Sequence, residues 1–168
     1  QEPGTLFGLV DDIWITRLIL ASVEGRPYSS PNFTPEAMLQ DELATLENGK
    51  AVNNTVWVGA GESVVDAYGN VVALADGVEV FDADGSRVTY TGIPIPMKQL
   101  VVNYTFRDQL KWKDGELVRQ EDFQLGYEVT CSVSTSRFLT CQRVQVFLAN
   151  AHGYDITWLP GHQDPLYY

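Results

Sequence analysis

Residues 63–74, SVVDAYGNVVAL, and residues 78–90, VEVFDADGSRVTY, decide the fold class of this chain. Each stretch has two runs rich in β-branched residues, separated by a short segment that contains a glycine. Gly69 and Gly85 follow a tyrosine and an aspartate, and glycine readily adopts the positive φ that tight hairpin turns require. The two stretches therefore predict neighbouring β-hairpins, and with the helices predicted below they indicate a mixed, β-rich α/β fold.

Beyond the hairpins, the pattern predicts further strands and one helix. Pro94 and Pro96 indicate an interruption of strand pairing, because proline cannot donate a backbone hydrogen bond. The predicted helix lies near 121–131, where Glu121 and Asp122 open the segment from Phe123 to Val129. The predicted strands, which are rich in β-branched and aromatic residues, are 52–58, 101–107, 142–148 and 155–159.

The first fifty residues have a different pattern from the rest of the chain. Two aspartates at 11–12 precede apolar residues and predict a helix with an acidic first turn. Thr34, which is followed by a proline, has the features of an N-cap, and this second helix should run to about Glu47. We therefore divide the single predicted domain into a helical and loop segment, 1–50, and a hairpin-rich segment, 51–168.

Charge and length restrict the classes of partner. The chain has 168 residues with 22 acidic and 11 basic side chains, which gives a formal net charge of -11. A protein of this charge is repelled by nucleic acid and by anionic membranes, whereas cationic or zwitterionic ligands are compatible with it. No apolar run approaches the roughly 20 residues that a membrane-spanning helix needs.

Two cysteines, Cys131 and Cys141, flank a short stretch of mostly small polar residues. Their spacing is not the Cys-x-x-Cys of a redox or zinc site. A disulfide between them would close a loop and stabilise the fold by about 2–3 kcal/mol, and it would suit an oxidising compartment. The alternative is a pair of unpaired thiols.

Other motifs fail at identifiable positions. The run from Asp82 to Asp84 resembles the start of a calcium loop, but its twelfth position is Ile93 where the motif needs a glutamate. His152 and His162 are too far apart in sequence to form, with the cysteines, the short ligand pairs that hold zinc. No nucleophile motif or acid–base pair stands out. The sequence therefore predicts no metal, no cofactor and no enzymatic activity.

The stretch 101–123, VVNYTFRDQLKWKDGELVRQEDF, resembles the signature of bacterial extracellular solute-binding proteins of family 5. These are the oligopeptide- and dipeptide-binding components of ABC transporters. In their signature a strand is followed by Lys-Trp-Ser-Asp-Gly and then by Pro-Val-Thr-Ala-Glu-Asp-Phe at the start of a helix. Leu117 and Arg119 depart from it, since they replace the usual proline and the usual threonine cap. The positions in register are Phe106, Arg107, Lys111, Trp112, Asp114, Gly115, Val118, Glu121, Asp122 and Phe123.

The likeness extends to other parts of the chain. The opening QEPGTL resembles the family's Glu-Pro-x-x-Leu, and the stretches 64–72 and 160–165 resemble one branch of the family. The resemblance implies the N-terminal part of the first lobe of a two-lobed, periplasmic-binding-protein-like fold. It also implies that Glu2, with Gly4 beside it, contacts the peptide at the cleft.

The residues of the central motif have a structural interpretation of their own. Trp112 beside a tight turn would hold a hairpin against the following helix. Asp114 can accept hydrogen bonds from the amides of the turn, and Gly115 can adopt a positive φ. We therefore interpret these three residues as structural.

The resemblance implies a transport function without catalysis. The protein would bind peptides outside the cytoplasmic membrane, as a periplasmic or cell-surface lipoprotein, and deliver them to an ABC permease. As a fragment with half of a cleft, this chain would bind ligand weakly or not at all and could self-associate through its exposed faces. The alternative is a non-catalytic, β-rich surface interaction or adhesion module, which fits the hairpins, the acidity and the possible disulfide equally well.

Overall fold

The computed structural model describes residues 28–29, 34–132, 139–164 and 167. The chain is a mixed α/β protein rich in antiparallel strands, which confirms the coarse fold class predicted from the sequence. Within these residues, no helix combines the length and apolarity needed to cross a membrane. In chain order the elements are β1 (Tyr28–Ser29), β2 (Glu36–Ala37), β3 (Ala51–Val58), β4 (Ser63–Val65), β5 (Val71–Ala73), β6 (Glu79–Phe81), β7 (Arg87–Thr89), β8 (Ile95–Thr105), α2 (Gln120–Ser132), α3 (Leu139–Gln142), β9 (Val144–Asn150) and β10 (Gly153–Trp158).

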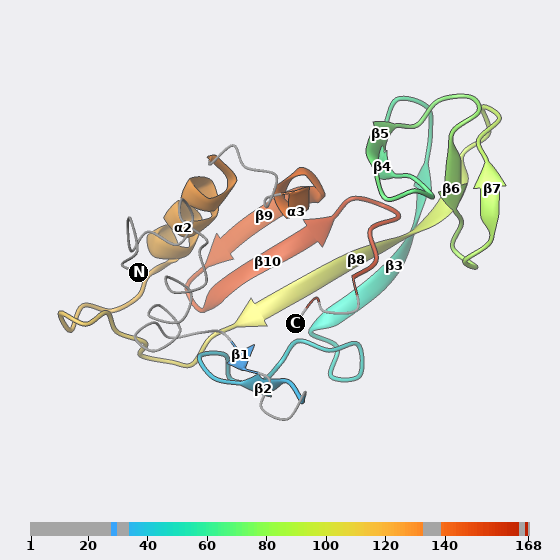
Figure 1. The fold of residues 1–168 in the computed structure, drawn as a ribbon. Coiled ribbons are helices and arrows are strands. Elements are labelled where there is room, and N and C mark those ends of the chain that lie inside the picture. The colour runs from blue at the N-terminus through green and yellow to red at the C-terminus, as the bar shows by residue number, and fades with distance from the viewer. Residues whose placement is uncertain (1–27, 30–33, 133–138, 165–166, 168) are drawn as a thin grey trace, which may run out of the picture.

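Four strands form the main sheet, in the order β3-β8-β10-β9 (Figure 1). All three pairings are antiparallel, and β8 lies inside the sheet, where it pairs with β3 over Ile95–Val102 and with β10 over Val101–Thr105. The sheet is open, so β3 and β9 form its two edges. The strands predicted from the sequence at 52–58, 101–107, 142–148 and 155–159 all fall within this sheet to within a few residues.

The chain between β3 and β8 folds into two small hairpins, β4–β5 and β6–β7, at one end of the long β3–β8 pair (Figure 1). Both predicted hairpins are therefore confirmed. They are built alike, with an offset of sixteen residues in the sequence. Gly61 donates a backbone hydrogen bond to Leu74, and Gly77 donates the equivalent bond to Tyr90.

The turns of the hairpins also hold the module together. The amide of Ala67 in the first turn donates to the carbonyl of Glu79 at 2.8 Å, and the amide of Ala83 in the second turn donates to Pro96 at 2.8 Å. Each turn is thus hydrogen-bonded to the element that follows it. The hairpins share a closely packed core of Val58, Val64, Leu74, Val80, Tyr90 and Met97, all at most 2% exposed.

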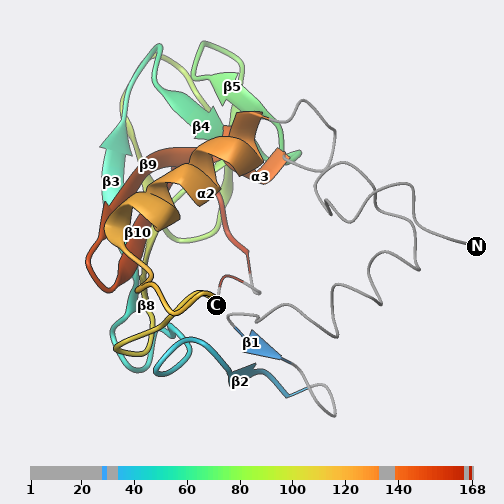
Figure 2. The same ribbon diagram turned by 90° about the vertical axis from the view of Figure 1, so that its left-hand side faces the viewer.

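A second core covers one face of the main sheet. Its buried residues include Val102, Tyr104 and Trp158 from the sheet and Ala44 from the segment before β3. Figure 2 shows α2 lying across β9 and β10, where Phe123 of the helix packs on this core. Alternation along β8 produces this arrangement, because every second residue of a strand points to the same face.

The predicted helix from Thr34 to Glu47 is wrong. Residues 36–37 form strand β2, and Gln40 makes an isolated bridge to Phe106 beside the end of β8. Strand β2 pairs with β1, and Asp41 donates its amide to the carbonyl of Thr105 of β8 at 3.2 Å, so these backbone groups are not available to a helix. Tertiary pairing has overridden the local start signal. The helix predicted after residues 11–12 lies outside the described residues.

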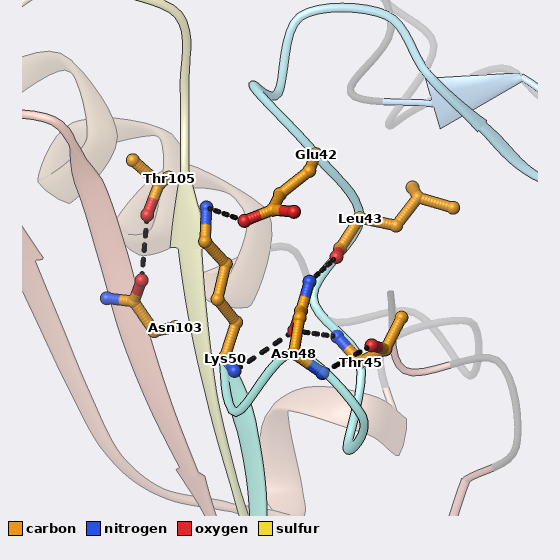
Figure 3. Close-up of polar contacts among 7 residues, drawn as sticks. All are labelled: Glu42, Leu43, Thr45, Asn48, Lys50, Asn103 and Thr105. Carbon is orange, nitrogen blue, oxygen red and sulfur yellow. Dashed lines mark hydrogen bonds and ion pairs between the residues drawn. The ribbon is translucent and has the colours of Figure 1, made fainter.

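The side chain of Asn48 organises the turn at residues 46–49, just before β3 (Figure 3). Its Oδ1 accepts hydrogen bonds from the amides of Thr45 at 3.0 Å and Lys50 at 3.1 Å, and its Nδ2 donates to the carbonyl of Leu43 at 2.8 Å. An ion pair between Lys50 and Glu42, with N···O 3.3 Å, lies beside it. Asparagine commonly replaces helical backbone bonds in this way, which explains why the stretch forms turns.

The helix predicted near 121–131 is confirmed as α2. The predicted interruption of pairing at Pro94 and Pro96 is wrong for Pro96, which lies in β8 and pairs with Trp57. This end of β8 extends beyond its pairing with β10, so it behaves as an edge, where proline is tolerated. The short helix α3 was not predicted, because four residues carry too little periodicity to be recognised.

Candidate functional site

The residues of the central motif form a tight turn before α2. Lys111 and Leu117 make an isolated antiparallel bridge, and the amide of Trp112 donates to the carbonyl of Glu116 at 2.8 Å. Asp114 accepts the amide of Glu116 at 3.0 Å, and Gly115 has φ +93°. The turn thus uses its aspartate and glycine for backbone geometry, and it exposes about half of the Trp112 side chain.

Asp122 joins this turn to the helix. Its Oδ2 accepts the indole N–H of Trp112 at 3.1 Å and the amide of Arg119 at 2.8 Å. These two bonds lower the pKa of Asp122, and the bond from Arg119 contributes more than the bond from Trp112. A carboxylate that bonds back to the residue before the helix is half of a capping box. Asp122, the third residue of α2, therefore caps the helix, which is preceded by Arg119 and not by the threonine of the family signature.

Cys131 and Cys141 are joined in a disulfide with a Cα–Cα distance of 5.7 Å. The bond links the end of α2 to α3, and α3 leads directly into edge strand β9. The helix is thus held at both ends, at its start by the Asp122 contacts to the preceding turn and at its end by the disulfide to α3.

A hollow of about 570 Å³, called the polar hollow here because several charged side chains line it, lies where the hairpins meet the main sheet. The two hairpins, strand β8, the residue between α3 and β9 and the loop after β10 supply its walls. Its size is in the range of small-molecule sites. The residues that line it are Val65, Asp66, Ala67, Gly69, Phe81, Asp82, Ala83, Asp84, Gly85, Lys98, Arg143, Gly161, His162 and Gln163.

Two half-buried cations line this hollow. Lys98 donates from Nζ to the hydroxyl of Thr55 at 3.0 Å, and Arg143 donates from Nη2 to the carbonyl of Gly69 at 2.7 Å. Neither has a carboxylate within 4.0 Å in the part of the chain that the structure describes, whereas the half-buried Lys50 is paired with Glu42. Both charges are therefore held in place by neutral oxygens, with donors left over for a ligand.

The aspartates of the hollow are largely used by the hairpin turns. Asp66 accepts the amides of Tyr68 at 2.9 Å and Asn70 at 2.8 Å, and Asp82 accepts the equivalent pair in the second hairpin. Partial desolvation raises the pKa of Asp66, but hydrogen bonds led by that from Asn70 outweigh it, so the net pKa is lowered. Asp66 therefore stays ionised, and both Asp66 and Asp82 stabilise their turns through these bonds.

His162 is the buried member of the site. It is 4% exposed, its ring lies 4.5 Å from that of Trp158, and its Nε2 has no hydrogen-bond partner among the described residues. Burial is the main reason why the pKa of His162 is lowered, and the charge of Arg143 adds to this, while Asp164 acts in the opposite direction. His162 is therefore neutral at pH 7.

Gly161 allows the loop to cross between the sheet and the hairpins. Its amide donates to the carbonyl of Lys98 at 2.8 Å, and the amide of Val65 donates to Pro160 at 2.9 Å. Gly161 has φ +86°, and a Cβ there would lie 2.4 Å from the carbonyl oxygen of Val65. No other residue fits without movement of the backbone.

The sequence-predicted ligand contacts Glu2 and Gly4 lie outside the described residues. Trp112, Asp114 and Gly115 come together at the start of α2 and are not among the residues that line the polar hollow. Lys98 and Arg143 as site residues, and Asp122 as the cap of α2, were not predicted from the sequence. The available signal for Asp122 was its position, three residues after the expected cap at position 119. Nothing in the sequence linked Lys98 with Arg143.

Comparisons with protein-family models, with curated proteins and with solved structures found no match. Among the described residues, no group of three or more histidines, cysteines, aspartates or glutamates could hold a metal ion. The geometry of the polar hollow is therefore the basis for assigning a function.

Proposed function

We propose that this chain is a non-catalytic peptide-binding protein, the N-terminal part of the substrate-binding component of an ABC importer. The observation that carries the proposal is the pair of half-buried cations, Lys98 and Arg143, in one hollow of a protein with a net charge of -11. A guanidinium with unused donors binds a carboxylate through two parallel hydrogen bonds. The ligand end that suits the hollow is thus the C-terminal carboxylate of a peptide.

Other features of the hollow suit the rest of a peptide. Gln163 and Asn53 exchange side-chain hydrogen bonds at 2.8 and 3.3 Å at its edge, and amide side chains of this kind can also bond to a peptide backbone. Asp84 is exposed on the hairpin side and carries a negative charge opposite in sign to the cations. A zwitterion with separated charges matches this arrangement.

The likeness to family 5 supports the finer part of the proposal. The turn at Trp112 and the capped start of α2 form one hydrogen-bonded unit, as expected for a signature that serves the fold. The open sheet is compatible with one wall of a two-lobed, periplasmic-binding-protein-like protein. We propose that this wall closes on peptide with a second lobe, outside the cytoplasmic membrane, and presents it to a permease. The disulfide suits that compartment.

A titration followed by NMR tests the proposal, because weak binding by a single wall is measurable in this way. Trialanine should shift the amide resonances of residues around Lys98 and Arg143, and trialanine with an amidated C-terminus should bind about tenfold more weakly, since one charge-assisted hydrogen bond is worth roughly 1.5–3 kcal/mol. Equal binding of both peptides would contradict the assignment of the carboxylate to this hollow.

Two matched substitutions test whether the peptide binds in the polar hollow. Lys98→Met should weaken trialanine binding about tenfold by the same reasoning. Lys113→Met removes the same charge from an exposed turn outside the hollow and should leave binding unchanged. If both variants lose binding equally, net charge and not the hollow explains the result.

A second candidate, a surface interaction module that self-associates, is favoured by the open face of the main sheet. Register places Val52, Val101, Thr157 and Val146 in one row across the four strands. Val52 is 45% exposed, Val146 is 41% exposed, and Leu148 on the edge strand is 59% exposed. Sedimentation velocity should then show a dimer that Val146→Asp dissociates, and a monomer at all concentrations would exclude this candidate.

A further inference from the structure

A second hollow, of about 550 Å³, lies between α2 and the main sheet. It is distinct from the polar hollow, and the two share no lining residue. Aromatic and aliphatic side chains form most of its wall. The lining residues are Asp122, Phe123, Gly126, Tyr127, Thr130, Cys131, Thr140, Cys141, Val144, Phe147, Tyr154, Ile156 and Trp158.

The helix does not fill this space. No residue of α2 is buried, although the helix lies across β9 and β10 (Figure 2). Gly126 lies inside the helix and lines the hollow, and a Cβ there would meet no atom within 4 Å. Glycine is among the least favourable residues in a helix interior, so a larger side chain would be expected at a position with no steric conflict. Gly126 therefore leaves unfilled space beside the helix that only a side chain much larger than a methyl group would occupy.

The walls favour flat, uncharged groups. The rings of Tyr127 and Phe147 are stacked with centroids 4.1 Å apart and an interplanar angle of 2°, and the ring of Tyr154 lies 5.1 Å from that of Phe147. No lysine or arginine is among the described residues that line the hollow, and its carboxylate, Asp122, is already bonded to Trp112 and Arg119. Tyr154 remains a neutral hydroxyl, because burial raises its pKa to about 12. A charged ligand would thus find no new partner here.

We propose that the hollow beneath α2 is a binding site for an aromatic ring. The ring packs against Phe147 and Tyr154 at the opening that Gly126 leaves in the helix. It can belong to a free aromatic molecule or to the side chain of a peptide ligand. The peptide form rests on the function proposed above, whereas the binding of a free aromatic molecule does not depend on it.

Two substitutions at one position test the site. Gly126→Ala adds a single methyl group, so it should strengthen the helix and leave binding unchanged. Gly126→Phe places a ring in the opening and should reduce binding at least tenfold. Circular dichroism and the melting temperature of each variant show whether the helix is intact, and Leu125→Phe on the neighbouring exposed position is the control for added apolar surface.

The probes are indole, trialanine and Ala-Phe-Ala, each titrated by NMR into the 168-residue protein. Indole should shift the resonances of Gly126, Phe147 and Tyr154 in the unaltered protein and in Gly126→Ala, but not in Gly126→Phe. Absence of indole binding, or equal binding to Gly126→Phe, would overturn the aromatic site.

The peptides separate this inference from the proposed function. If the proposed function and the aromatic site are both correct, Ala-Phe-Ala binds more tightly than trialanine, and Gly126→Phe removes this difference in affinity. Indole binding without any peptide binding would refute the proposed function and retain the aromatic site for free molecules. Equal binding of both peptides, with no response to indole, would retain the proposed function and refute the aromatic site.

Discussion

The hairpin module and the layer formed by α2 are packed in opposite ways. In the hairpins, Val64 and Val80 are completely buried, and Leu74 and Tyr90 are nearly so. In α2 no residue is more than partly buried. Each hairpin turn is joined by a backbone hydrogen bond to the strand that follows the hairpin, whereas the helix is held by aromatic contacts, the Asp122 cap and a disulfide.

The difference follows from the sequence separation of the partners. Each hairpin closes over a few residues and repeats sixteen residues later, so local pairing aligns its apolar residues for burial. The helix must instead find its partners on β9 and β10, and it presents few apolar side chains to them. Close packing leaves no room for a ligand inside the hairpin core, so the polar hollow lies outside that core, whereas looser packing leaves a hollow beneath α2 itself. The two regions should therefore respond differently to substitution.

The largest expected loss of stability is at the junction of the hairpins and the sheet. Gly161→Ala should destabilise the protein by about 3 kcal/mol or more, because it combines a strained positive φ with a collision between Cβ and a backbone oxygen. Gly77→Ala is the matched control, since its φ of +84° is similar but a Cβ there meets no atom within 4 Å. It should cost about 1–2 kcal/mol.

Urea denaturation of the two variants measures this difference. Equal losses would show that backbone conformation alone accounts for the effect and that the junction is less tightly packed than the comparison requires.

The next largest effect concerns the helix. Replacing Cys131 and Cys141 by serine should lower the free energy of unfolding by about 2–3 kcal/mol, because the bond closes a loop of ten residues. Hydrogen exchange should show faster opening in α2 and unchanged protection in the hairpins. Reduction of the unaltered protein should reproduce the result, and uniform loss of protection would mean that the two regions unfold together.

A smaller effect is expected at the start of α2. Asp122→Ala removes the acceptor for both Arg119 and Trp112, so the melting temperature should fall by a few degrees and the first turn of the helix should fray. Trp112→Phe removes one of the two bonds and should have the smaller effect. In the double variant, Trp112→Phe should add little, because its partner is already gone. Additive losses would show that the two contacts are independent.

The smallest expected effect is the pH dependence contributed by His162. Its pKa in the folded protein is lowered, mainly by burial, so the unfolded chain binds a proton first as the pH falls. The stability associated with its neutral form is fully present above about pH 6.5 and is lost as the pH falls through the lower, folded-state pKa. Melting curves between pH 7 and pH 5 should therefore show a decline that is weaker in His162→Gln. Parallel declines in both proteins would show that His162 titrates normally.

The hairpins, the strand at 101–107 and α2 could be predicted from the sequence because each depends on neighbours in the chain. The segment 34–47 could not, because Glu36–Ala37 pairs with β1 and residues 39–41 bond to the end of β8 and the residues just after it, more than sixty residues later. The local cap signal at Thr34 was real but weaker than that pairing. At the candidate sites, the turn of Asp114 and Gly115 was predictable, whereas the hollow lined by Lys98 and Arg143 depends on loops that are distant in sequence.

The sequence by itself determined the strand-rich class, the two hairpin turns and the turn before α2, because glycine, aspartate and β-branched residues restrict the backbone locally. The tertiary structure alone decided where the loop after β10 crosses to the hairpins, which cations face one hollow and how much space remains beneath the helix. Those features depend on how separate elements fit together, and short-range preferences carry no information about that fit.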